Sequence, residues 1–162
     1  MRYLRHLFTD QASVRRAFPP AAMQAITAAI AEGEQTHDGE LRFAIEASLP
    51  HAYLRHRGSA HQRALDVFSH LRVWDTEHNS GVLIYILLAD RHVEIVADRG
   101  IHAKVGDGAW NAIVKTMQDE FAAGRFEAGS VAGIKAISQL LAAHFPPGTD
   151  NPNELPDEPV VL

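Results

Sequence analysis

The clearest hydrophobic pattern in the chain is an apolar run at residues 82–88, followed by a second strand-like segment at residues 92–98. The first segment reads Val-Leu-Ile-Tyr-Ile-Leu-Leu, a composition typical of a central strand that is buried on both faces. Apolar and polar residues alternate more in the second segment, so one of its faces is expected to be less buried. The short connection between them predicts an antiparallel β-hairpin in which Leu88 pairs with His92.

One further strand and five helices are predicted from the spacing of apolar residues. Leu41, Phe43, Ile45 and Ala47 fall on one side of a strand at residues 41–48. Five other segments carry apolar residues at helical spacing. These predicted helices cover residues 10–18, 20–34, 59–71, 105–123 and 128–144.

The order of these elements predicts the topology. The strand, helix and strand between residues 41 and 88 form a right-handed βαβ unit, in which the two strands lie parallel. The hairpin then adds an antiparallel strand, and the remaining helices are expected to cover both faces. We therefore expect an α/β fold, a three-layer α/β/α sandwich on a short mixed sheet with a central β-hairpin. Residues 1–145 are expected to form this one domain.

Composition and charge narrow the class of protein. With 46% hydrophobic and 22% charged residues, the 162-residue chain resembles a soluble globular protein. It has no cysteine, no recognisable signal peptide and no apolar run of membrane-spanning length, so we expect a cytoplasmic protein without a membrane span. The net charge of −5 gives no basic excess, and no nucleic-acid partner is expected.

The last 17 residues differ from the rest of the chain. Residues 146–162 are rich in proline and carry Asp150, Glu154, Asp157 and Glu158 with no lysine or arginine, so they supply −4 of the net charge of −5. Segments of this composition bury little apolar surface. Residues 146–162 are therefore predicted to be a disordered acidic tail.

The predicted topology brings several polar segments to one end of the sheet. Residues 39–42, 76–81 and 98–102, and the start of the helix at residue 105, all lie there because strands 41–48 and 82–88 start together. The candidate ligand-binding residues are Glu40, Arg42, Thr76, His78, Asn79, Asp98, Arg99 and His102. Carboxylates with amide and backbone oxygens suit Ca²⁺ or Mg²⁺, and the candidate cation ligands are Glu40, Asp98 and Asp107. The alternative is that these residues cap helices or brace loops.

Motifs for other chemistry were not found. There is no phosphate-binding P-loop, no dinucleotide fingerprint and no nucleophile elbow, so no catalytic residue is identified. The basic stretch at residues 51–63, which includes Arg57, could contact phosphate groups, but a solvated loop is the favoured interpretation because the stretch is short and isolated in a near-neutral body. His51, His56 and His61 recur at intervals of five, which does not match a helical or finger-type zinc site.

Several short segments carry a family resemblance. They are Gly39-Glu-Leu-Arg42, Thr76-Glu-His-Asn-Ser-Gly-Val-Leu-Ile-Tyr85, Asp90-Arg91, Ala97-Asp-Arg-Gly-Ile101 and Phe121-Ala-Ala-Gly-Arg-Phe-Glu-Ala-Gly129. As a set they resemble the TPM domain family over about residues 20–145. The resemblance implies an α/β/α sandwich, a calcium-binding cleft and, from the plant member of the family, acid phosphatase activity.

Together these observations predict a domain that binds a small ligand or a divalent cation at one end of the sheet. Weak phosphomonoesterase activity is expected from the family resemblance alone. The alternative is a non-catalytic interaction or scaffold module, which would bind another protein through its acidic tail or through the basic stretch 51–63.

Overall fold

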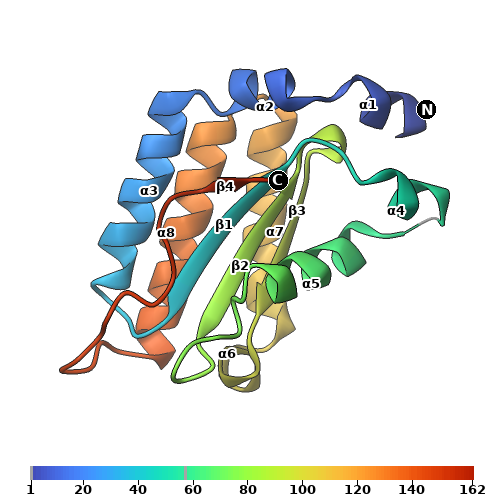
Figure 1. The fold of residues 1–162 in the computed structure, drawn as a ribbon. Helices are drawn as coiled ribbons and strands as arrows, with labels where there is room; N and C mark the ends of the chain where they lie inside the picture. Colours follow the sequence, from blue (N-terminus) through green and yellow to red (C-terminus); the bar gives the residue numbers. More distant parts are fainter. Residues whose placement is uncertain (1, 57) are drawn as a thin grey trace.

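The computed structural model describes residues 2–56 and 58–162 (Figure 1). Met1 and Arg57, the latter part of the predicted basic stretch, lie outside the described residues. The elements are α1 (Arg2–Phe8), α2 (Gln11–Ala17), α3 (Pro20–Glu34), β1 (Glu40–Glu46), α4 (His51–Arg55), α5 (Ala60–His70), β2 (Gly81–Leu87), η1 (Leu88–Asp90), β3 (His92–Ala97), α6 (Arg99–Val105), α7 (Asp107–Ala122), α8 (Phe126–His144) and β4 (Val160–Val161).

The sheet has the order β3-β2-β1-β4, and helices cover both of its faces. β1 is parallel to β2 and β2 is antiparallel to β3, as the βαβ unit and the hairpin predicted. The larger apolar core lies between the sheet and helices α3, α7 and α8, whereas a smaller core lies between the sheet and α5. The predicted α/β/α arrangement on a short mixed sheet is therefore confirmed.

The register of the hairpin differs by one residue from the prediction. Leu87, rather than Leu88, pairs with His92, which places Val82 opposite Ala97 instead of Asp98. β2 ends before Leu88 because this residue begins η1, a 3-10 turn. The turn is followed by Arg91, which has a left-handed φ of 49°. The turn thus takes one residue more than the sequence pattern indicated, and Asp98 becomes free to cap the next helix.

Three short helices, α1, α4 and α6, were absent from the prediction. Residues 99–105, expected to be a loop, form α6, because Asp98 accepts a hydrogen bond from the backbone N–H of Arg99 and so caps its N-terminus. At the other end of the sheet, α1 is anchored to the η1 turn, where Arg2 Nη2 lies 2.9 Å from Asp90 Oδ2. α6 shows no clear apolar stripe. In α1, Tyr3, Leu4, Leu7 and Phe8 recur at helical spacing, but all four are exposed, so this helix adds little to the core.

The C-terminal segment is ordered, contrary to the prediction of a disordered tail. Residues 146–162 run back along the sheet, where Val160 and Val161 pair in parallel with Ala44 and Ile45 of β1. Leu155 is buried in the smaller core. Composition predicted disorder, but the open edge of β1 offers unpaired backbone groups that this segment satisfies. Among the described residues, none of the helices combines the length and the apolar character that crossing a bilayer requires.

Candidate functional site

Three of the polar segments predicted to share one end of the sheet do meet there. Glu40 and Gly81 are register partners at the start of β1 and β2. The N–H of Glu40 donates to the carbonyl of Ser80 at 3.1 Å, and the N–H of Asp98 donates to the carbonyl of Gly81 at 2.8 Å. The loop before β2 therefore lies between the start of β1 and the start of α6.

The loop at residues 76–81 is held in shape by its own polar side chains. Thr76 Oγ1 accepts a hydrogen bond from the N–H of Ser80 at 2.9 Å. Asn79 has a left-handed φ of 52°, which asparagine tolerates better than most residues, and its Oδ1 accepts a bond from Arg99 Nη2 at 3.3 Å. Thr76 thus braces the loop internally, and the bond between Asn79 and Arg99 connects the loop to α6.

Gly100 allows this loop and α6 to approach each other closely. A Cβ atom at this position would lie 2.6 Å from the carbonyl oxygen of Asn79 and 2.9 Å from that of His78. Those distances are shorter than van der Waals contact, so a side chain would push the two segments apart. Two backbone carbonyls are therefore presented to the first turn of α6.

Asp98 and Ser80 each carry a buried oxygen that lacks a hydrogen-bond partner. Asp98 Oδ1 accepts from the N–H of Arg99 at 2.7 Å, whereas its Oδ2 is buried and unpaired. Ser80 Oγ is also buried without a partner. Buried oxygens are nearly always satisfied by protein, water or an ion, so each of these two atoms is a candidate contact for a further ligand.

The other predicted ligand residues point elsewhere. Asp107 and His102 are mostly exposed, and their nearest oxygen and nitrogen are 3.6 Å apart. His78 is exposed on the loop. Within residues 2–56 and 58–162, no three histidine, aspartate or glutamate side chains are gathered in a way that would hold a metal ion. Glu40, Asp98 and Asp107 are therefore not brought together as a set of cation ligands.

Glu40 and Arg42 face the C-terminal segment. Glu40 Oε2 accepts hydrogen bonds from the N–H groups of Glu154 and Leu155 at 3.2 and 3.0 Å. Burial raises the pKa of Glu40 from its ordinary 4.5 to about 7. Arg42 Nη1 donates to the carbonyls of Pro156 and Glu158. Both side chains therefore contribute to holding the segment rather than to the loop around Asp98.

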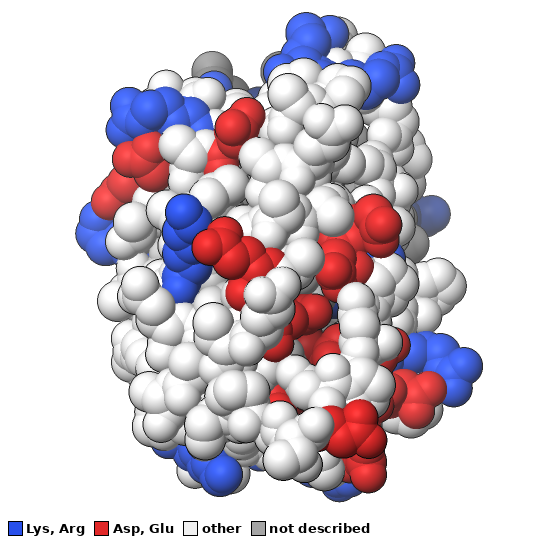
Figure 2. Space-filling model, turned by 90° about the vertical axis from the view of Figure 1, so that its left-hand side faces the viewer, with Lys and Arg blue, Asp and Glu red and all other residues white. Residues whose placement is uncertain are grey.

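Sequence reasoning missed Glu34, the last residue of α3, because it falls where a solvent-exposed helix end is expected. Its Oε1 accepts a hydrogen bond from the N–H of Leu41 at 2.7 Å. Burial, with smaller contributions from Glu40 and Asp157, raises the pKa of Glu34 from 4.5 to about 8. Figure 2 shows acidic side chains gathered on this side of the molecule, where α3 and the C-terminal segment lie.

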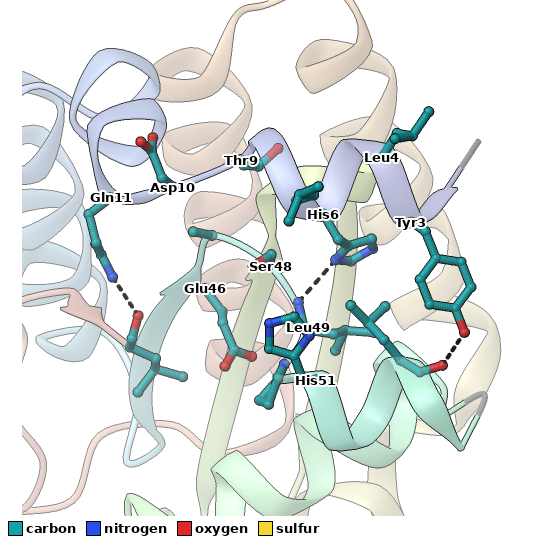
Figure 3. Close-up of a pocket in the computed structure, with 15 residues that line it drawn as sticks. Tyr3, Leu4, His6, Thr9, Asp10, Gln11, Glu46, Ser48, Leu49 and His51 are labelled. Carbon is teal, nitrogen blue, oxygen red and sulfur yellow. Dashed lines mark hydrogen bonds between the residues drawn. The ribbon is translucent and has the colours of Figure 1, made fainter.

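A cavity of about 550 Å³ lies at the opposite end of the sheet, between α1, the end of β1 and α4 (Figure 3). His6 and Tyr3 of α1 help to form it: His6 Nδ1 accepts from the N–H of Leu49 at 3.0 Å, and the hydroxyl of Tyr3 donates to the carbonyl of Leu54. The sequence analysis did not predict this cavity, because α1 and α4, which form two of its walls, were not predicted.

Glu46, one of the residues that line this cavity, is the centre of a largely buried polar network. Arg63 Nη2 donates to Glu46 Oε1 at 2.8 Å and Arg63 Nε donates to Glu46 Oε2 at 2.9 Å. The hydroxyl of Tyr85 donates to the same carboxylate. Burial, with the Glu46 charge next in importance, raises the pKa of Tyr85, so this phenol stays protonated. The carboxylate is fully satisfied by these donors, and the network stabilises the fold without leaving an oxygen for a ligand.

Comparisons with known proteins give two matches for the arrangement described above. The family model described as TPM domain matches residues 9–140 of the chain. The NMR structure of the BA42 protein from the psychrophilic bacterium Bizionia argentinensis is 32% identical, with a TM-score of 0.78, and the match covers 88% of this chain and 93% of that one. None of the curated proteins matches the chain significantly.

Proposed function

This chain belongs to the TPM domain family, and from that membership we propose that it binds a divalent cation, Ca²⁺ or Mg²⁺, between the loop 76–81 and the start of α6. The single observation that carries the proposal is the buried, unpaired Oδ2 of Asp98. A carboxylate oxygen kept from water without a donor is costly unless a cation or an ordered water lies against it.

The oxygen atoms near Asp98 are of the kind that hard cations prefer. Ca²⁺ takes about six to eight oxygen ligands from carboxylates, carbonyls, hydroxyls and water. The loop supplies the carbonyls of His78 and Asn79 next to Gly100, and the hydroxyl of Ser80 is a further unpaired oxygen. These residues fit a cation held by one carboxylate, protein oxygens and several waters.

The proposal revises the set of ligands expected from the sequence. Glu40 is replaced as a ligand because its carboxylate accepts two backbone N–H groups of the C-terminal segment. Asp107 is replaced because it is exposed on the first turn of α7. With a single carboxylate, the affinity is expected to be weak, on the order of 10⁻⁴ to 10⁻³ M, since affinity rises with the number of charged ligands.

Cation titration of the ¹⁵N-labelled chain, followed by amide NMR, tests the proposal. We expect saturable shifts in residues 76–81 and 98–102 on adding CaCl₂ or MgCl₂. Asp98→Asn removes the charge but retains a side chain that caps helices well, so it should abolish the shifts while leaving the fold intact. Asp107→Asn is the matched control and should behave as the wild type.

Two outcomes would contradict the proposal. The first is an absence of shifts in the loop and in the first turn of α6 at millimolar cation. The second is a titration of equal affinity in the wild type and in Asp98→Asn, which would place the cation on other ligands.

A further inference from the structure

The outer edge of β1 is the one place where the sheet is completed by a segment outside the family domain. The family match ends at residue 140, whereas β4 lies at residues 160–161. On this edge Ala44 and Ile45 pair with β4, and the N–H of Leu162 donates to the carbonyl of Ile45 at 2.9 Å. The remaining length of β1 is contacted by side chains and irregular backbone of the same segment.

Most contacts that hold the segment recognise backbone rather than side chains. Glu40 accepts from the N–H groups of residues 154 and 155, and Arg42 donates to the carbonyls of residues 156 and 158. Side chains add specificity: Leu155, only 7% exposed, is buried in the core that lies under α5, and Val160 and Leu162 pack against the same core. An anchor residue in a socket, flanked by main-chain hydrogen bonds, is the mode by which sheet edges bind extended peptides.

We infer that the edge of β1, with Glu40, Arg42 and the socket that holds Leu155, is a peptide-binding groove whose occupant, residues 153–162, exchanges with the same segment of a second copy of this chain. We name this surface the β1 edge groove. The occupant is the one peptide whose fit is shown directly, since every contact made within the chain is available to an identical segment from another chain. Such an exchange is a low-cost route to a dimer because it creates few new contacts.

The route to the groove favours exchange. Pro146, Pro147 and Gly148 follow the end of α8 and separate the segment from the domain. The link is held by few bonds: the N–H of Gly148 donates to Asp38 Oδ1, and Asn151 Nδ2 donates to the carbonyls of Glu34 and His37. The segment therefore behaves as an arm attached through a short linker.

A buried carboxylate beneath the segment keeps the segment displaceable. Burial is the main cause that raises the pKa of Glu34 to about 8, with smaller contributions from Glu40 and from Asp157 of the segment, so ionisation of Glu34 opposes docking. Docking is favoured below the ordinary Glu34 pKa of 4.5 and weakens as the pH rises through about 8, because the free groove binds this proton less tightly. The titratable or charged groups that face the groove are Glu34, His37, Asp38, Glu40, Arg42, Glu77, Glu154, Asp157 and Glu158.

A labelled peptide of residues 151–162, added to the full chain at pH 6 and followed by fluorescence anisotropy, tests the groove. In the wild type, the attached segment competes at an effective concentration in the millimolar range, so binding should be weak. Leu155→Ser in the chain empties the socket, and this variant should bind the peptide at least tenfold more tightly than the wild type. The same change in the peptide should weaken its binding at least tenfold. A chain that was merely destabilised would not gain affinity.

Two further measurements keep the inference open to refutation. Val160→Gly weakens the strand pairing at the chain end, and it replaces Leu155→Ser if that variant fails to fold. Sedimentation velocity of the wild type at rising concentration should show a dimer that excess peptide dissolves. Equal peptide binding by the wild-type and weakened chains, or no binding by either, would overturn the groove. A chain that stays monomeric at every concentration would overturn the exchange between copies.

Discussion

Glu34→Gln is the substitution that most directly tests how the C-terminal segment is held. In the folded chain, burial raises the pKa of Glu34 from 4.5 to about 8. Glutamine keeps the oxygen that accepts from the N–H of Leu41 but cannot ionise. Because the folded chain binds the Glu34 proton more tightly than the unfolded chain, this contribution is fully present below pH 4.5 and is lost as the pH rises through about 8.

The size of the effect follows from that interval. Each pH unit corresponds to about 1.4 kcal/mol, so complete ionisation within an intact fold would cost about 5 kcal/mol. Release of the C-terminal segment lets water reach the carboxylate and limits the loss. We therefore expect the wild type to lose about 2–3 kcal/mol of unfolding free energy between pH 5 and pH 9, with Glu34→Gln losing markedly less.

Urea denaturation followed by circular dichroism at each pH unit from 5 to 9 measures this difference. Wild type and Glu34→Gln should be similar at pH 5 and should separate progressively above pH 6, with the variant more stable. Glu32→Gln, on the exposed side of the same helix, is the matched control and should follow the wild type. Parallel curves for the wild type and Glu34→Gln would refute the role assigned to Glu34.

Three other predictions concern the two ends of the sheet. Gly100→Ala should lower the unfolding free energy by about 1–3 kcal/mol in the same assay, because the added Cβ meets backbone oxygens. Gly108→Ala is the control: its Cβ meets nothing within 4 Å, so the unfolding free energy should stay unchanged or rise. Arg63→Ala should cost about 3–5 kcal/mol, since it removes the counter-ion of the buried Glu46 carboxylate, and a loss below 1 kcal/mol would show that water replaces the arginine. Any hydrolysis of p-nitrophenyl phosphate should require the divalent cation and fall at least tenfold in Asp98→Asn; activity unaffected by that change would remove Asp98 from the reaction.

The strands and the longer helices could be predicted because their apolar residues follow the period of the element. The run Val-Leu-Ile-Tyr-Ile-Leu at residues 82–87 is buried throughout, and the alternation in β1 separates the two cores correctly. The register of the hairpin was wrong by one residue, since the pattern does not distinguish a strand residue from the first residue of a 3-10 turn. Leu88 is apolar and buried in either case.

The location of the candidate site could also be predicted, whereas the contacts of its residues could not. Topology alone brought Glu40, Ser80 and Asp98 to one end of the sheet. The hydrogen-bond partners of these side chains lie in segments whose structure could not be predicted from hydrophobic periodicity. Asp98 caps a helix that was expected to be a loop, and Glu40 binds a segment that was expected to be disordered.

The two buried glutamates of β1 show why the C-terminal segment, rather than the rest of the sheet, is the part that exchanges. Glu46 has a positive partner in Arg63 and a donor in Tyr85, so its negative charge is stabilised in place. Glu40 lies six residues earlier on the same face of β1, and in the described part of the chain it is matched by backbone N–H groups and by no ion pair. A buried carboxylate with a fixed counter-ion stabilises the structure around it in its ionised form. A carboxylate matched only by the N–H groups of an acidic segment holds that segment less firmly once it is ionised. The end of β1 near Arg63 is therefore expected to be rigid at all moderate pH values, and amide exchange along β1 should rise with pH at its outer edge ahead of its end at Glu46.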